Sequence, residues 1–157
     1  NNPKVKAMIS LTKGEGFGRP LLEFSTLNKP IITTGWSGHI DFLSKDYCAL
    51  LGGELEKVHS SAQVKDMILG EAQWFKVGDQ WINNGYQDVF LKYDEWKLKS
   101  KKQGAHSRKN FSYKKMKSKI KEILDLTIPE LPKKMELKLP NVSKIKMPKK
   151  DKLKIVK

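Results

Sequence analysis

A glycine-rich turn near the start of the chain joins an apolar run to a helix that opens on a proline. The turn occupies residues 14–18 (Gly-Glu-Gly-Phe-Gly), and Pro20 stands where the first helical residue is expected. Glycine allows positive φ angles and a close approach of the backbone to a ligand. The amide groups and positive dipole end of a helix that begins near Arg19 would point at the contents of the turn, as at phosphate sites of α/β proteins. This stretch therefore predicts a strand, a ligand-binding turn and a helix in succession.

Strands and helices alternate along the first third of the chain. Apolar or β-branched runs bounded by turn residues predict strands, and residues 28–30 (Asn-Lys-Pro) end the first helix because the residue before proline avoids the helical region. The predicted strands are residues 5–11, 31–34 and 47–51, and the predicted helices are residues 20–27 and 39–43. Such alternation is typical of an α/β fold with a Rossmann-like, doubly wound parallel sheet, which binds ligands beyond the carboxyl ends of its strands.

The middle of the chain changes from irregular to helical. Residues 54–76 show no sustained hydrophobic period, so we expect an irregular excursion with one short helix at residues 62–68. From Asp79 onward apolar residues recur at helical spacing, and an aromatic stripe of this kind is far more often core than ligand platform. A break at residues 110–112, with Ser112 as N-cap, precedes a second amphipathic helix. The first predicted apolar face comprises Tyr86, Val89, Phe90, Tyr93 and Trp96, and the second comprises Tyr113, Met116, Ile120, Ile123 and Leu124.

After Leu126 the composition changes to a basic repeat of eight residues. Leucine or methionine precedes proline at positions 131, 139 and 147, and a triplet of apolar, lysine and apolar residues recurs at the same period. Proline at this spacing prevents a continuous helix, and so few large apolar residues bury little area. We therefore expect residues 1–126 to form the domain and residues 127–157 to form an extended or disordered Lys/Pro tail.

The glycine-rich turn and the segment after it resemble a known enzyme family. The pattern Glu-x-Phe-Gly-x-x-x-x-Glu runs from Glu15 to Glu23, and residues 27–38 add an Asn-Lys-Pro break, an Ile-Ile strand and a Gly-x-x-Gly turn. Two glutamates at this spacing are common, but these elements in this order are not. The chain resembles the C-terminal, donor-binding half of retaining GT-B glycosyltransferases (group 1, family 4-like). The resemblance covers residues 5–126, and its specific part ends near Leu43.

The resemblance implies roles for particular residues. Glu15 would accept hydrogen bonds from the donor sugar and Glu23 from the ribose of the nucleotide, because an ionised carboxylate can take two hydroxyl donors. The main chain of both glycine turns would line the donor site. The implied substrate-binding residues are Glu15, Gly16, Phe17, Gly18, Glu23, Gly35, Trp36, Ser37 and Gly38, with Glu15 as the catalytic residue. The implied donor substrate is a nucleoside-diphosphate sugar, and no metal or cofactor is implied.

The charged residues of the motif also have simpler interpretations. Glu23 suits the first turn of a helix, where a solvated acid complements the dipole, and Glu15 suits an ordinary loop acid. Neither Lys13 nor Arg19 can be assigned to the donor diphosphate, and Lys13 is more simply a solvated loop cation. By the resemblance, the basic residues that neutralise the diphosphate are expected upstream of Asn1.

The length of the chain limits what it does alone. With 157 residues it suffices for one domain with its own core. A GT-B enzyme, by the resemblance, needs two Rossmann-like halves with the active site between them. The chain opens Asn-Asn-Pro without an initiator methionine. We therefore expect it to be the C-terminal part of a longer protein, whose missing N-terminal half binds the acceptor, a glycan, lipid or polysaccharide.

Positive charge is concentrated in two segments. The net charge is +10 over residues 92–121 and +7 over residues 129–157, compared with +14 for the whole chain. Such clusters suit an anionic membrane surface, an acidic glycan or nucleic acid. Lysine supplies 29 of the 31 basic residues, whereas arginine is preferred for bidentate phosphate recognition, so nucleic acid is not expected as a partner. The simpler alternative is a set of solvated helix faces in a protein from an AT-rich genome.

Other chemistry finds little support in the sequence. His39, His59 and His106 lack cysteine or acidic partners at metal-ligand spacing, so no zinc site is expected. The single cysteine, Cys48, lies in an apolar strand and forms no intrachain disulfide, which fits a reducing, cytoplasmic compartment. No run reaches the roughly eighteen apolar residues of a membrane span. A membrane contact would therefore be peripheral, at the inner face, and an upstream signal or anchor stays open.

Two functions from different classes follow. The first is a retaining, metal-independent, hexosyltransferase-like glycosyltransferase, of which this chain is the donor-binding part. The second is a non-catalytic basic module of GT-B-like fold that binds an anionic polymer or a membrane through residues 92–157. Saturable nucleotide binding separates the two, since only the first function requires it.

Overall fold

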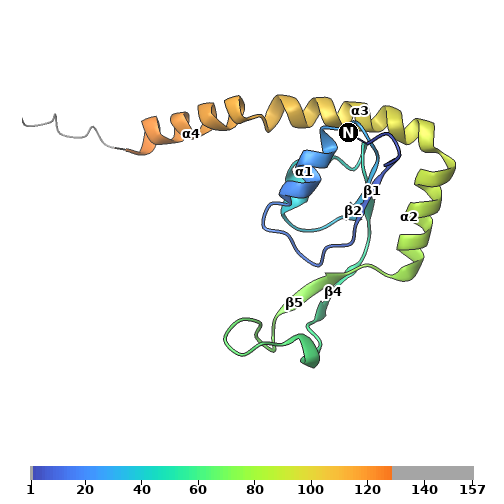
Figure 1. Cartoon of the computed structure of the whole chain (residues 1–157). Helices are drawn as coiled ribbons and strands as arrows, with labels where there is room; N and C mark the ends of the chain where they lie inside the picture. Colours follow the sequence, from blue (N-terminus) through green and yellow to red (C-terminus); the bar gives the residue numbers. More distant parts are fainter. Residues whose placement is uncertain (1, 129–157) are drawn as a thin grey trace, which may run out of the picture.

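The protein has an α/β fold built on a three-stranded parallel sheet (Figure 1). The computed structural model describes residues 2–128. Strands β1 (Met8–Ser10), β2 (Ile31–Thr34) and β3 (Ala49–Leu51) lie in the order β1-β2-β3, and Ile32 of β2 pairs with Ile9 and Ala49. The predicted α/β class and parallel sheet are confirmed, and β2 has its predicted bounds. The first and third strands are shorter than predicted.

Helices cover both faces of this sheet. Side chains alternate along β2, so Ile31 packs with Leu21 and Phe42, whereas Ile32 packs with Val89 on the opposite face. The first face is covered by α1 (Arg19–Ser25) and by a 3₁₀ turn, η1 (Gly38–Asp41), and the second by α2 (Asp79–Leu91). The predicted helix at residues 39–43 is therefore the single turn η1.

The segment at residues 54–76 contradicts the sequence prediction. Strands β4 (Glu54–Lys57) and β5 (Gln73–Lys76) form an antiparallel hairpin that extends from the sheet (Figure 1). No helix forms at residues 62–68; a 3₁₀ turn, η2 (Ser60–Ala62), and an isolated bridge between Val64 and Ile68 stand there instead. The hairpin was missed because β4 and β5 carry charged and glutamine residues, and their pairing spans a long loop that local patterning does not reveal.

The helical region contains one more break than predicted. Helix α2 ends at Leu91, and α3 (Tyr93–Asn110) starts after a single intervening residue, Lys92. Asp88 fixes this corner, because it accepts a hydrogen bond from Trp96 Nε1 at 2.9 Å and pairs with Lys92 Nζ at 2.7 Å. The hydrogen bond from Lys92, and then that from Trp96, lowers the pKa of Asp88.

The aromatic stripe predicted as core is only partly buried. Val89 and Trp96 lie in the core, but Tyr86 and Phe90 are 56% and 68% exposed. Tyr93 is intermediate. The exposed part of the stripe faces β1 across an open apolar groove of about 360 Å3. The prediction that all five residues form core is therefore wrong for the two most exposed rings.

Helix α3 is held to the domain by polar side chains. Gln103 donates from Nε2 to the carbonyl of Phe42 at 2.7 Å, and its Oε1 accepts from the amide of Ser44 at 3.0 Å. The hydroxyls of Ser107 and Ser25 lie 2.7 Å apart. All four of the polar residues Ser25, Ser100, Gln103 and Ser107 are at least 98% buried. A hydrogen-bonded polar seam thus joins α3 to α1 and η1.

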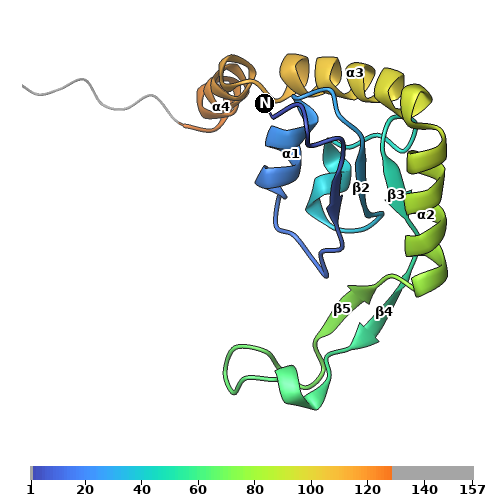
Figure 2. The ribbon, with the colours of Figure 1, turned by 45° about the vertical axis from the view of Figure 1, so that its right-hand side comes forward.

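Helix α4 (Tyr113–Thr127) has the predicted start but an unexpected environment. Ser112 is its N-cap, as predicted, and its side chain accepts from the Lys115 amide. None of its residues is buried, and its later turns project beyond the body of the domain (Figures 1 and 2). The helix includes residue 127, the first residue of the predicted tail, and residues 129–157 lie outside the described part of the chain. Among residues 2–128, no helix combines the length and apolar character that a membrane crossing requires.

Candidate functional site

The two glycine turns lie together at the carboxyl ends of β1 and β2. The Ser37 hydroxyl accepts a hydrogen bond from the Glu15 amide at 2.8 Å and donates one to the Glu15 carbonyl at 2.6 Å. The Gly38 amide donates to the same carbonyl at 3.1 Å. Three hydrogen bonds therefore join residues 14–18 to residues 35–38, so that the turns form one rigid unit.

Close packing makes two glycines necessary in this unit. A β-carbon at Gly38 would overlap the carbonyl oxygen of Gly16. Gly18, the N-cap of α1, has a φ of +80°, and a β-carbon there would come within 2.8 Å of the His39 β-carbon. Side chains at either position would force the turns apart. The glycine pattern that is conspicuous in the sequence thus has a structural cause that does not depend on a ligand.

Ser37 adopts a backbone conformation that is rare outside glycine. Its φ is 85° and its ψ is −172°. Residues held in such regions cost about 1–3 kcal/mol and cluster at binding and catalytic sites. The hydrogen bonds between Ser37 and Glu15 hold the conformation in place. Sequence reasoning named Ser37 only as a lining residue, because its bonds to Glu15 span 22 positions.

His39 is a buried polar group directly beneath these turns. Its Nε2 lies 2.6 Å from the carbonyl oxygen of Thr34, so this nitrogen carries the proton and donates it. Nδ1 is then an acceptor, and it has no hydrogen-bond partner among the described residues. The sequence analysis considered His39 only as a metal ligand. Its position straight after the Gly-x-x-Gly turn was the available signal for a role beside the site.

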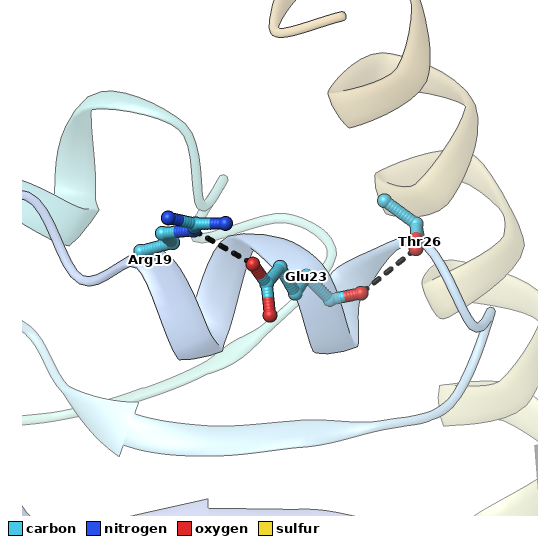
Figure 3. A network of polar contacts seen from close by, with 3 residues as sticks. All are labelled: Arg19, Glu23 and Thr26. Carbon is cyan, nitrogen blue, oxygen red and sulfur yellow. Dashed lines mark hydrogen bonds and ion pairs between the residues drawn. The ribbon is translucent and has the colours of Figure 1, made fainter.

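The two glutamates are placed differently. Glu15 is half-buried and its backbone is fixed by Ser37, whereas the Glu23 side chain is 64% exposed on the outer side of α1. Arg19 Nε donates to Glu23 Oε1 at 2.8 Å, and Figure 3 shows this ion pair. Arg19 therefore faces Glu23 rather than the glycine turn in this structure.

Glu23 borders an open groove between α1 and the start of α4. The groove has a volume of about 570 Å3, and its charged lining residues are Arg19, Glu23 and Lys117. Its apolar lining residues are Phe17, Leu22, Phe111, Tyr113, Met116 and Ile120. Glu15 is not among the lining residues. The predicted convergence of both carboxylates on one pocket is thus not seen in this groove.

Phe17 links the glycine turn to the α3–α4 junction. Its ring lies 5.2 Å from Phe42 and 6.5 Å from Phe111, and the last two rings are 5.8 Å apart. Phe42 is buried in the first core cluster. The turn is therefore anchored by an aromatic cluster on one side and by Ser37 on the other.

The β4–β5 hairpin forms a wall beside the same turn. The Phe75 amide donates to the Lys13 carbonyl at 2.9 Å, and the Phe75 ring stacks on Trp36 at 5.7 Å. The ammonium group of Lys13 lies 4.0 Å from the centre of the Trp74 ring. Lys13 is exposed, as expected of a loop cation, but it makes a cation–π contact that was not predicted. Trp36 likewise contributes its side chain to the hairpin contact.

Other reactive groups lie apart from this unit. Burial raises the pKa of the Cys48 thiol to about 12, so the thiol stays protonated near neutral pH. Within residues 2–128, no three histidine, cysteine or acidic side chains gather as a metal site would require.

Comparisons of this chain with protein-family models, with curated proteins and with solved structures find no match. The GT-B resemblance therefore rests on the motif residues themselves and stays a prediction. The structure adds the parallel α/β fold and the joined glycine turns to that motif.

Proposed function

We propose that this chain is the donor-binding part of a retaining glycosyltransferase, which transfers a sugar from a nucleoside-diphosphate sugar to an acceptor. The observation that carries the proposal is the pair of joined glycine turns at the carboxyl ends of two parallel strands. Ligands of parallel α/β sheets bind at this edge. The Glu15 to Glu23 pattern supplies the ligand class through its resemblance to GT-B enzymes.

Glu15 acts in this proposal by fixing the sugar. Departure of the diphosphate places positive charge on the anomeric carbon, and a carboxylate that holds neighbouring hydroxyls orients the sugar for that step. The three hydrogen bonds between the turns immobilise the Glu15 backbone before the donor arrives.

Glu23 holds the ribose by exchanging partners. Its ion pair with Arg19 is exposed, and exposed pairs of this kind contribute about 0–1 kcal/mol. Two ribose hydroxyls that donate to the carboxylate therefore replace the guanidinium at little cost.

Calorimetric titration of the chain with uridine and guanosine diphosphates, and with their sugar esters, tests this proposal. Saturable binding is expected for one base, and Glu23→Ala should weaken it about tenfold or more, because hydrogen bonds to a charged group are lost. Glu15→Gln should weaken binding of the sugar ester but leave binding of the free nucleoside diphosphate unchanged. Glu71→Ala, an exposed loop acid, is the matched control. Absence of saturable binding, or an equal effect of Glu71→Ala, would refute the proposal.

The second candidate is the non-catalytic basic module. The specific observation in its favour is that Glu23 is paired with Arg19 and that the groove bordered by Glu23 does not include Glu15. This candidate predicts that neither glutamate variant changes any binding property. The same titrations therefore separate the two functions.

A further inference from the structure

Helix α4 presents an apolar stripe that the rest of the described chain leaves open. Its members recur three or four positions apart, which places them on one face of the helix. They are Tyr113, Met116, Ile120, Ile123 and Leu124, with exposed fractions between 44% and 84%. The first three border the groove beside α1, whereas Ile123 and Leu124 are not among the residues that line it. The later turns of α4 project beyond the domain (Figure 1). This stripe was predicted from the sequence as an amphipathic face, and the structure shows that it is not part of the core.

Lysines occupy the remaining positions around the stripe. Helix α4 carries five lysines and two acids, a net charge of +3 over 15 residues. At 100° per residue, Lys117 and Lys121 border one side of the stripe and Lys119 lies beyond the other. Long lysine stems extend along an apolar surface while their ammonium groups stay in water. The helix therefore combines an apolar face with positive charge on both of its edges.

We propose that α4 docks on an anionic lipid surface, with its apolar stripe at the boundary between headgroups and acyl chains. A helix with one apolar face and a lysine-rich face around the rest of its circumference is the form that lies in a membrane interface without crossing it. Negative lipid headgroups match the lysines, and the acyl region matches isoleucine, leucine and methionine. This docking is independent of the proposed donor site.

Charge and apolarity together select lipid over the other anionic partners. Nucleic acid and acidic glycans would satisfy the lysines but would leave the exposed isoleucine and leucine side chains against a polar polymer. A bilayer interface satisfies both faces of the helix at once. The helix is about 22 Å long. Because Tyr113, Met116 and Ile120 border the groove beside α1, its last two turns, which carry Ile123 and Leu124, make the main contact with such a surface.

Selective labelling provides a direct test on the whole chain. Ile123→Cys and Ser118→Cys each introduce one exposed thiol, on the apolar stripe and on the opposite face, while the native Cys48 is buried with a raised pKa. Each thiol is coupled to a polarity-sensitive dye and titrated with vesicles of phosphatidylcholine and phosphatidylserine in equal parts. The fluorescence emission of the dye at position 123 should shift to shorter wavelength. The emission of the dye at position 118 should stay unchanged, because that dye stays in water. Equal shifts at both positions, or none at either, would overturn the proposal.

Charge variants test the second half of the proposal. Lys119→Gln with Lys121→Gln should reduce binding to the mixed vesicles by about twenty-five-fold, because each lysine near an anionic surface contributes about fivefold. Lys101→Gln with Lys102→Gln, on exposed positions of α3, removes the same charge as a control and should change binding much less. Equal losses in the two pairs, or equal binding to vesicles of phosphatidylcholine alone, would contradict docking through α4.

An apolar variant separates lipid from protein partners. Ile123→Ser with Leu124→Ser should lower vesicle binding about tenfold or more and leave nucleotide titrations unchanged, because both residues lie outside the groove that Glu23 borders. Leu98→Ser, an exposed apolar residue of α3, is the matched control. If the chain instead does not bind vesicles and self-associates through Ile123 and Leu124, measured by analytical ultracentrifugation, the stripe is a protein interface and the proposal fails.

Discussion

Helices α3 and α4 are adjacent and both rich in lysine, yet their relations to the domain are opposite. Helix α3 has little apolar periodicity and still buries five residues, four of them polar or glycine. Helix α4 has the clearer apolar stripe and buries none. A β-carbon at Gly104 of α3 would overlap Asn28 Oδ1, which shows how closely α3 approaches the chain that follows α1.

The difference shows that amphipathic periodicity does not by itself decide which helix joins a core. Helix α3 is held by specific hydrogen bonds between buried groups, above all those of Gln103, and by one buried ring, Trp96. Each buried polar group without its partner would cost about 1–3 kcal/mol, so the seam is stable only when complete. A stripe of apolar side chains, in contrast, needs a surface that accepts it.

Among changes in α3, in α4 and at the α2–α3 corner, breaking the seam should give the largest effect on stability. Gln103→Ala removes the partners of the Phe42 carbonyl and the Ser44 amide, and we expect the free energy of unfolding to fall by about 3 kcal/mol. Gln87→Ala, at an exposed position of α2, is the control. Urea unfolding followed by circular dichroism measures both variants. A loss below about 0.5 kcal/mol for Gln103→Ala would show that the seam does not hold α3.

A smaller effect should appear at the corner where α2 meets α3. Hydrogen bonds from Lys92 and Trp96 lower the pKa of Asp88 in the folded protein. Its stabilisation is therefore present above the ordinary value near 3.8 and is lost as the pH falls through the lower folded value. Asp88 is partly exposed, so the contribution is at most about 1 kcal/mol. The stability difference between wild type and Asp88→Asn should shrink as the pH falls below the ordinary value of 3.8, and a constant difference would contradict this assignment.

The smallest effect is expected on α4. Ile123→Ala with Leu124→Ala should change the free energy of unfolding by less than about 0.5 kcal/mol, because neither side chain is buried. Leu21→Ala, in the core against the sheet, should cost about 2–5 kcal/mol in the same assay. A large loss in the α4 variant would mean that its stripe packs on the chain, and the contrast with α3 would disappear.

Local patterns predicted the elements that depend on local chemistry. Ile31 to Thr34 is β-branched throughout and forms β2, Pro20 lies in the first turn of α1, and Ser112 caps α4. The β4–β5 hairpin was not predictable in this way, because its pairing joins Glu54 to Lys76 across a long loop. The burial of Gln103 was equally hidden, since a polar residue is buried only where distant partners receive it.

The candidate site also combines features that depend on local sequence with features that depend on contacts between distant segments. Its glycines were visible in the sequence because their spacing is local, and the structure places both turns side by side. The hydrogen bonds of Ser37, the burial of His39 and the contact of Phe75 with Lys13 depend on contacts between separate segments. The pairing of Glu23 with Arg19 was predictable from the sequence, because the two residues are one helical turn apart.

At position 37, an unstrained backbone and a side chain that holds the neighbouring turn require different residues. Glycine would adopt its φ of 85° without penalty, yet glycine has no hydroxyl with which to fasten the neighbouring turn. Serine makes these hydrogen bonds at the cost of a strained backbone, so the strain at Ser37 is maintained by the contact between the two turns. Replacing this serine with glycine would relax the backbone and remove two of the three hydrogen bonds that join the turns, leaving only the bond from the Gly38 amide to the Glu15 carbonyl.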